Sequence, residues 1–208
     1  MELLSEPRAP VSPTSAAQAR EVHIADSLSG LEFEQLRAAR RIGDLGSGAG
    51  LPGLVLAAAL PDARIDLIES ASRKCEFLSE AVERMGIANA HVVCERSEEW
   101  AATDGREAYD AVTARAVGVL AELAELASPL LAEAGLLFAW RGRREPEQEE
   151  ALARASGRLA MEPVEVRPVE PYPGSRDRHI HLLRKNGPTP NDLPRRAGMA
   201  SKRPFGSE

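Results

Sequence analysis

Residues 41–53 read Arg41-Ile42-Gly43-Asp44-Leu45-Gly46-Ser47-Gly48-Ala49-Gly50-Leu51-Pro52-Gly53, and this stretch decides the fold. An expected strand, an acidic residue and three alternate glycines lead into an apolar helix, a pattern typical of nucleotide-binding strand-turn-helix units. Glycines at 46, 48 and 50 lack the Cβ atoms that would keep a ligand off the backbone, and they tolerate the positive φ of a tight turn. Such turns are common, so the segments that follow have to support a ligand.

A second expected strand, residues 63–69, ends on Glu69, 23 positions after Gly46. A carboxylate at this place commonly binds ribose hydroxyls, so a nicotinamide dinucleotide and S-adenosylmethionine both fit. Asp44 favours S-adenosylmethionine, because its charge would repel a pyrophosphate but can attract, directly or through water, the amino group of a methionine moiety. The alternative is that Asp44 caps the turn.

Alternating strand and helix patterns continue along the chain and predict an α/β fold with a mostly parallel sheet. Pro7, Pro10 and Pro13 favour disorder in residues 1–15, and residues 16–40 are expected as an N-terminal helical region. Residues 41–185 form the expected sheet domain, and residues 186–208 form a basic C-terminal tail. Further strands are expected at 90–94, 109–113 and 136–140, helices at 51–60, 70–85, 117–131 and 147–159, and a terminal hairpin at 163–169 and 179–184.

Polar residues follow the third and fourth expected strands, at the sheet edge where doubly wound folds bind ligands. Ser97 and Glu98 follow the third strand and can contact an adenine or, equally, cap a short helix. Arg115 follows the fourth strand. His23 and Asp26 have helical spacing and are interpreted as packing residues or, alternatively, as contacts of the RNA or the active site.

Composition points to one compact domain, because 208 residues with 43% apolar content can bury a sizeable core. No run reaches the roughly 18 apolar residues of a membrane-spanning helix, so no membrane association is expected. Cys75 and Cys94 lack metal-site spacing and no secretory leader is recognised, which predicts core or surface thiols of a cytoplasmic protein.

Charge is unevenly distributed in this chain of net charge −6. Eight basic and two acidic residues lie between Arg176 and Arg203, a local charge of +6 that leaves −12 for the rest. This segregation favours contact with a phosphate backbone, although a solvated charged tail has the same composition.

Taken together, these stretches resemble the family of bacterial small-subunit rRNA guanine-N7 methyltransferases, also called the glucose-inhibited division protein B family. The resemblance covers about residues 20–205. Two departures are a short N-terminal helical region and Arg141, which stands where the family usually has a lysine. The resemblance rests on His23-Ile24-Ala25-Asp26-Ser27-Leu28, the run from Asp44 to Gly53, Arg115-Ala116, Arg178-His179, Pro194-Arg195-Arg196-Ala197-Gly198 and Lys202-Arg203-Pro204.

The resemblance implies a class I S-adenosylmethionine-dependent methyltransferase, with a Rossmann-like, mostly parallel seven-stranded sheet ending in an antiparallel hairpin. The implied reaction is methylation of N7 of one guanine in the decoding-region loop of 16S rRNA, as naked RNA or within a small-subunit particle. The family's modification affects streptomycin susceptibility. No metal is expected, and the protein is expected to be a monomer.

Roles are carried over by motif. Arg115 and Arg141 are the expected catalytic residues, and Arg115 also contacts the donor. The remaining donor-site residues are Asp44, Gly46, Gly48, Leu51, Glu69, Ser97 and Glu98, and the expected RNA contacts are Arg178, Arg195, Arg196, Lys202 and Arg203.

The sequence offers no persuasive acid–base pair, which suits a nucleophile that already carries a lone pair, as guanine N7 does. Positioning in line with the methyl group can then supply about 7 to 11 kcal/mol. Two other functions remain open: a small-molecule methyltransferase and a non-catalytic RNA-binding protein on the same fold.

Overall fold

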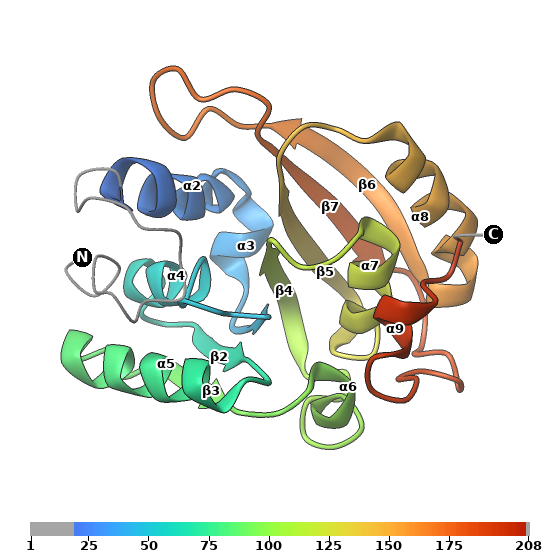
Figure 1. Ribbon diagram of the computed structural model, residues 1–208, viewed down its shortest axis with the longest axis horizontal. Coiled ribbons are helices and arrows are strands. Elements are labelled where there is room, and N and C mark those ends of the chain that lie inside the picture. The colour runs from blue at the N-terminus through green and yellow to red at the C-terminus, as the bar shows by residue number, and fades with distance from the viewer. Residues whose placement is uncertain (1–18, 207–208) are drawn as a thin grey trace.

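The computed structural model describes residues 19–206, which form a seven-stranded sheet between two layers of helices (Figure 1). The strand order is β3-β2-β1-β4-β5-β7-β6. The prediction of disorder for residues 1–15 falls outside the described residues, as do residues 16–18 and 207–208.

Six strands run in one direction and β7 alone among the seven runs the other way, so the sheet is mostly parallel, as the strand and helix patterns predicted. Strands β3, β2, β1, β4 and β5 pair in parallel, whereas β7 pairs antiparallel with both β5 and β6. The mostly parallel sheet and its C-terminal hairpin are therefore confirmed. The strands are β1 (Arg41–Leu45), β2 (Arg64–Ile68), β3 (Ala90–Val93), β4 (Tyr109–Arg115), β5 (Leu131–Arg141), β6 (Met161–Pro168) and β7 (His179–Lys185).

Helices cover both faces because successive strand residues point to opposite sides of the sheet. Leu67 and Phe138 belong to the core beneath α3, α4 and α5, whereas their neighbours Ile68 and Leu137 belong to the core beneath α7 and α8. Figure 1 shows the two groups of helices on either side of the strands. These helices are α3 (Glu34–Ala38), α4 (Gly53–Ala59), α5 (Ser72–Met85), α6 (Ser97–Trp100), α7 (Leu120–Ala127) and α8 (Pro146–Leu159).

Short helical turns form the N-terminal region, as the weak periodicity of residues 16–40 suggested. They are a π-helix η2 (Ala19–Ile24), α2 (Ala25–Leu28) and a 3-10 helix η3 (Ser29–Glu32). Trp140 at the end of β5 anchors them, because its Nε1 donates to the carbonyl of Asp26 at 2.8 Å. A Cβ at Gly30 would lie 2.4 Å from the Trp140 ring, so the region packs closely on β5.

The segment after β7 folds back onto the domain and ends in α9 (Met199–Lys202) beside α7 (Figure 1). Lys185, whose side chain is 0% exposed, starts this path. Its Nζ donates to Glu107 at 2.9 Å, to Thr189 at 2.6 Å and to the carbonyl of Leu131. The described part of the predicted C-terminal tail is thus packed against the domain.

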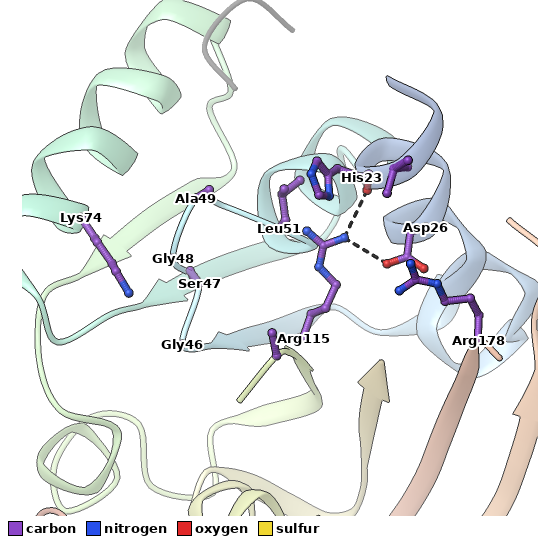
Figure 2. A pocket seen from close by; sticks show the side chains of 12 residues that line it. His23, Asp26, Gly46, Ser47, Gly48, Ala49, Leu51, Lys74, Arg115 and Arg178 are labelled. Carbon is purple, nitrogen blue, oxygen red and sulfur yellow. Dashed lines mark hydrogen bonds and ion pairs between the residues drawn. The ribbon is translucent and has the colours of Figure 1, made fainter. Parts of the chain in front are cut away.

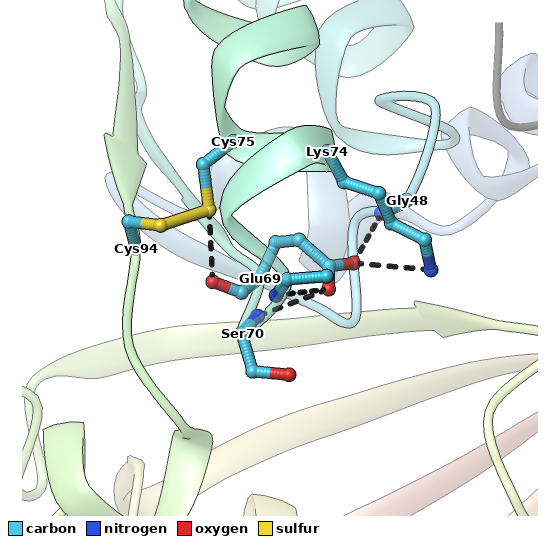
Figure 3. The surroundings of a disulfide bond; sticks show 7 residues. Gly48, Glu69, Ser70, Lys74, Cys75 and Cys94 are labelled. Carbon is cyan, nitrogen blue, oxygen red and sulfur yellow. Dashed lines mark hydrogen bonds and ion pairs between the residues drawn. A yellow bond between two sulfur atoms is a disulfide. The ribbon is translucent and has the colours of Figure 1, made fainter.

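Cys75 and Cys94 form a disulfide between the first turn of α5 and the end of β3 (Figure 3). The prediction of two separate thiols is therefore wrong. Their 19-residue separation gives no sign that the two Cα atoms lie 5.8 Å apart, because that proximity arises only when α5 packs beside β3.

Within residues 19–206, no helix combines the length and apolar character needed to cross a membrane.

Candidate active site

The glycine turn follows β1 and is fixed by backbone hydrogen bonds to the neighbouring strand. The amides of Gly46 and Ser47 donate to the carbonyl of Ile68 at 2.9 and 3.1 Å. Gly46 has a φ of +67°, and a Cβ there would lie 2.8 Å from Val117. The sequence therefore requires glycine at 46 for both conformation and space.

Asp44 lies beneath this turn rather than on its surface. The residue is 0% exposed, and its Oδ1 accepts a hydrogen bond from Thr113 at 2.8 Å. Burial raises the pKa of the Asp44 carboxyl. A part for Asp44 in donor binding, directly or through water, stays a prediction. The hydrogen bond between Asp44 and Thr113 joins the ends of β1 and β4, and the alternative of a turn-capping side chain also stays a prediction.

Glu69 ties the glycine turn to the start of α5 (Figure 3). Its Oε2 accepts a hydrogen bond from the amide of Gly48 at 3.0 Å and lies 3.7 Å from Nζ of Lys74. Its Oε1 accepts from the amides of Ser70 and Ala71. The carboxylate lies at the expected strand tip, with one face toward a pocket.

That pocket, here called the Glu69 pocket, measures about 180 Å³ and runs from Glu69 to α6. Gly46 and Val117 border it, and Ser97 and Glu98 line its far end. Ser97 is the first residue of α6, whose N-cap is Arg96 without a side-chain hydrogen bond, so the alternative that these residues cap the helix is wrong. Contact of Ser97 and Glu98 with an adenine stays a prediction. A nearby carboxylate and a polar far end suit an adenosine with its ribose beside Glu69.

A second pocket of about 420 Å³, the glycine-loop pocket, opens on the other side of the same turn (Figure 2). Gly46, Gly48 and Leu51 line its floor, and Arg115 and Lys74 approach from opposite sides. Gly46 borders both pockets. The two pockets, here called the donor cleft, meet at Gly46, an arrangement that suits a donor with an adenosine at one end and an amino acid at the other.

Arg115 is held in place by the N-terminal region. Its guanidinium donates to Oδ2 of Asp26 at 3.0 Å and toward the carbonyl of His23 at 3.5 Å (Figure 2). Asp26 is 5% exposed, so this ion pair is largely shielded from water. Burial and the charge of Arg115 lower the pKa of His23, which favours a neutral imidazole beside the pocket.

A third pocket of about 440 Å³, the Arg141 pocket, lies across Arg115 from the glycine turn. Arg115, Arg141 and Arg178 line it. Arg141 donates to the carbonyls of Val117 and Gly118 at 3.1 and 2.8 Å and to Gln148, so it holds the loop between β4 and α7. Burial lowers the pKa of the Arg141 guanidinium.

Arg178 immediately precedes β7 and borders both pockets that meet at Arg115. Its NH2 group lies 3.3 Å from the hydroxyl of Tyr172. A cationic side chain at this junction can contact a phosphate next to a base held in the Arg141 pocket.

The remaining expected RNA contacts divide into two kinds. Arg195 forms a two-bond ion pair with the buried Glu125, with both N–O distances 2.6 Å. Its charge is therefore committed within the fold. Arg196, Lys202 and Arg203 are exposed, and among the described residues their side chains have no ion-pair partner.

Two features of the site were missed from the sequence. One is the fixing of Arg115 by Asp26, for which the helical spacing of His23 and Asp26 was the only signal. The other is the presence of Gly198, Ala200 and Ser201 in the Glu69 pocket. Charge dominated the interpretation of that segment, whereas its small residues enter the pocket.

Among the described side chains, no group of three or more histidines, cysteines, aspartates or glutamates is placed to hold a metal ion.

Comparison with known proteins identifies one family. The family model described as GidB, rRNA small subunit methyltransferase G, matches residues 9–180. A ribosomal RNA small subunit methyltransferase G of Rubrobacter xylanophilus is 42% identical over 88% of this chain and 72% of its own length. A protein of the same name from Syntrophomonas wolfei is 37% identical over 94% and 90%.

Solved structures share the fold at lower identity. A predicted O-methyltransferase from Agrobacterium tumefaciens has a TM-score of 0.62 at 23% identity, covering 78% of this chain and 81% of that one. The fibrillarin of Aeropyrum pernix, solved with natively bound S-adenosyl-L-methionine, has a TM-score of 0.58 at 19% identity, covering 76% and 72%. These likenesses establish the class I methyltransferase fold.

Proposed function

Because the chain belongs to the GidB family of rRNA small subunit methyltransferase G proteins, we propose that it methylates N7 of a guanine in the decoding-region loop of 16S rRNA. The methyl donor is S-adenosylmethionine. The observation that carries the proposal is the meeting of the donor cleft and a cation-lined pocket at Arg115. An rRNA substrate places the protein in the cytoplasm.

The donor cleft fits S-adenosylmethionine in its shape and polar groups. When bound, this cofactor supplies a methyl group on a positively charged sulfur. Glu69 would accept hydrogen bonds from the ribose, with Ser97 and Glu98 at the adenine end. Gly46, Gly48 and Leu51 would border the methionine moiety.

The Arg141 pocket would hold the acceptor guanine. Arginine donors match the O6 and N7 edge of guanine, and a guanidinium can also stack on the base. Because N7 itself must remain free to attack, Arg115 would bind O6 or the base face. Asp26 keeps that guanidinium aimed at the junction through the 3.0 Å contact.

Contacts to RNA phosphates would come from two places. Arg178 lines the Arg141 pocket, and Arg196, Lys202 and Arg203 are exposed in the part of the chain that follows β7. Such contacts position an RNA without reading its sequence. Arg195 would act indirectly, by holding that segment through Glu125.

Transfer of a radiolabelled methyl group to small-subunit rRNA that lacks its N7 modification tests the proposal, with the product mapped by cleavage at N7-methylguanine. We expect label at a single guanine. The variant Gly46→Val should lose transfer and donor binding, because its side chain would collide with Val117. Gly187→Ala is the matched control, since a Cβ there meets nothing within 4 Å and φ is not positive.

The outcomes separate the alternatives. Donor binding with label on a small molecule but none on RNA would replace the proposal with a small-molecule methyltransferase. RNA binding that weakens with salt while no donor is consumed would leave a non-catalytic RNA-binding protein. Equal transfer by Gly46→Val and wild type would contradict the assigned donor cleft.

A further inference from the structure

The C-terminal segment, defined here as residues 193–206, contributes to the Glu69 pocket as well as carrying positive charge. Gly198, Ala200 and Ser201 line this pocket, and Gly198 contacts Glu98 there. Ala200 is 2% exposed and Leu193 is 3% exposed, so the segment is packed at both places. The pocket assigned to the adenosine is therefore lined in part by a segment far along the chain from the glycine turn.

Glu98 joins the two sides of the pocket. Its Oε1 accepts a hydrogen bond from the amide of Gly198 at 2.7 Å, and its Oε2 accepts one from Ser97 at 3.1 Å. Glu98 is 9% exposed, so the contact is sheltered from water. A backbone amide donating to a carboxylate is a charge-assisted hydrogen bond, roughly twice as strong as a neutral one.

A second attachment lies on the outer side of the segment. Arg195 reaches Glu125 of α7 with two 2.6 Å contacts, and its NH2 also donates to the carbonyl of Arg203 at 2.7 Å. The ring of Phe205 packs against the same guanidinium, and the Cζ atom of Arg195 lies 3.9 Å from the centroid of that ring. These contacts fix the segment on α7, and the hydrogen bond from Gly198 to Glu98 fixes it at the pocket.

We propose that the C-terminal segment is the outer wall of the donor pocket, and that Glu98 is the positioning residue that holds this wall through the Gly198 amide. This inference rests on the proposed donor cleft. It gives the basic segment a second role, in donor binding, that does not depend on RNA.

Calorimetry of S-adenosylmethionine binding to the full chain without RNA tests this role. Glu98→Ala removes the acceptor for Gly198, and we expect donor affinity to fall about tenfold. Glu98→Gln keeps a side-chain oxygen for the same amide and should stay within about threefold of wild type. Glu99→Ala is the matched control, because Glu99 is an exposed glutamate of the same helix.

Trypsin cleavage at Arg196 and Lys202 gives a second measurement that general destabilisation would not reproduce. Both residues are exposed on the segment. Saturating donor should slow cleavage there in the wild type and in Glu99→Ala. In Glu98→Ala, at a donor concentration that again saturates the protein, this protection should be reduced.

Three results decide the inference. Wild-type affinity and wild-type protection in Glu98→Ala would overturn it while leaving the proposed function intact. Equal weakening in Glu98→Ala and Glu98→Gln would also overturn it, because the retained acceptor would then have no effect. Failure of the wild type to bind the donor would instead refute the donor cleft itself.

Discussion

Arg115 shows how one side chain is given its position by a distant part of the chain. It lies at the end of β4, yet its guanidinium is fixed by Asp26 of α2, 89 residues earlier. Trp140 in turn binds the backbone of Asp26. Because Arg115 is already held in place, it loses less conformational entropy when it orients a substrate.

Replacing Arg115 with alanine should lower the turnover number about 100-fold, the usual effect of losing one fixed hydrogen-bond donor at a reacting centre. Donor affinity should stay within a few-fold of wild type, because the glycine turn and Glu69 keep their contacts. Single-turnover kinetics and calorimetry measure the two effects separately. Arg40→Ala is the control, because Arg40 lies just before β1, at the other end of the strands from Arg115. Unaltered turnover in Arg115→Ala would exclude Arg115 from the active site.

Single residues were predicted from the sequence where a local motif requires them, and less well where burial decides. Gly46, Gly48 and Glu69 line the pockets as expected, since turn geometry and strand ends are local properties. Asp44 was expected to face the ligand. Its burial depends on the close packing of Gly53 and on Thr113 of β4, which is 69 residues away along the chain.

At the scale of secondary structure, the regular pattern of the middle of the chain fixed most elements to within a few residues. The helix expected at 147–159 is α8, Pro146–Leu159, and the expected hairpin strands are β6 and β7. The strand expected at 136–140 extends over Leu131–Arg141. Its added first half pairs with β4 at Leu131, opposite Tyr109, and residues 132–135 form an irregularity in which Ala134 has a φ of +65°, which no local pattern predicts.

Gly157 should be a weak point of α8, because a helical glycine gains backbone freedom on unfolding. A Cβ at 157 meets nothing within 4 Å. Gly157→Ala should therefore raise the free energy of unfolding by about 0.5 to 1 kcal/mol. Denaturant titration measures the change.

Gly86 at the end of α5 gives the matched comparison. A Cβ there also meets nothing within 4 Å, but its φ of +63° is left-handed. Gly86→Ala should therefore destabilise the protein. Stabilisation by both substitutions, or by neither, would contradict the account.

At the scale of the whole molecule, the positive charge of the C-terminal segment was predicted from the sequence, but its packing against the domain was not. Its basic residues were recognised as a group. That Arg195 would be neutralised by Glu125, or that Lys185 would be buried with Glu107, depends on partners about 70 and 80 residues away. No local pattern carries that information. The monomeric state remains a prediction.

Neutralising the three exposed cations of this segment should separate its role in RNA binding from its role in donor binding. The triple variant Arg196→Gln, Lys202→Gln and Arg203→Gln should weaken RNA binding and make the slope of log K against log salt shallower by about 2 to 3. Donor affinity without RNA should be unchanged, since none of these side chains lines the Glu69 pocket. Filter binding over a salt series measures the slope. An unchanged slope would exclude these residues from phosphate contact.

Acid should weaken the anchoring of the segment at Lys185. Hydrogen bonds from Thr189 and Lys185 lower the pKa of Glu107 to about 2 from 4.5. A carboxyl with a lowered pKa in the folded state stabilises the fold above its unfolded pKa, and this stability is lost as the pH falls from about 5 toward 2. Denaturant titrations across this range should show a smaller acid-dependent loss in Glu107→Gln than in wild type.

The same variant should be less stable than wild type at pH 7, because it leaves the buried Lys185 without its counter-charge. Glu76→Gln, at an exposed position of α5, should follow the wild-type acid profile. If Glu107→Gln also followed it, the pairing with Lys185 would not contribute to acid stability.

The disulfide between α5 and β3 also changes the unfolded chain. It closes a loop across a sequence separation of 19 residues, and a loop of this size removes conformational entropy worth about 3 kcal/mol from the unfolded ensemble. A compartment buffered by glutathione would open the cross-link and restore that freedom. Unfolding curves recorded with and without a reductant therefore refer to two different unfolded states, and only the reduced one describes the protein inside a reducing cell.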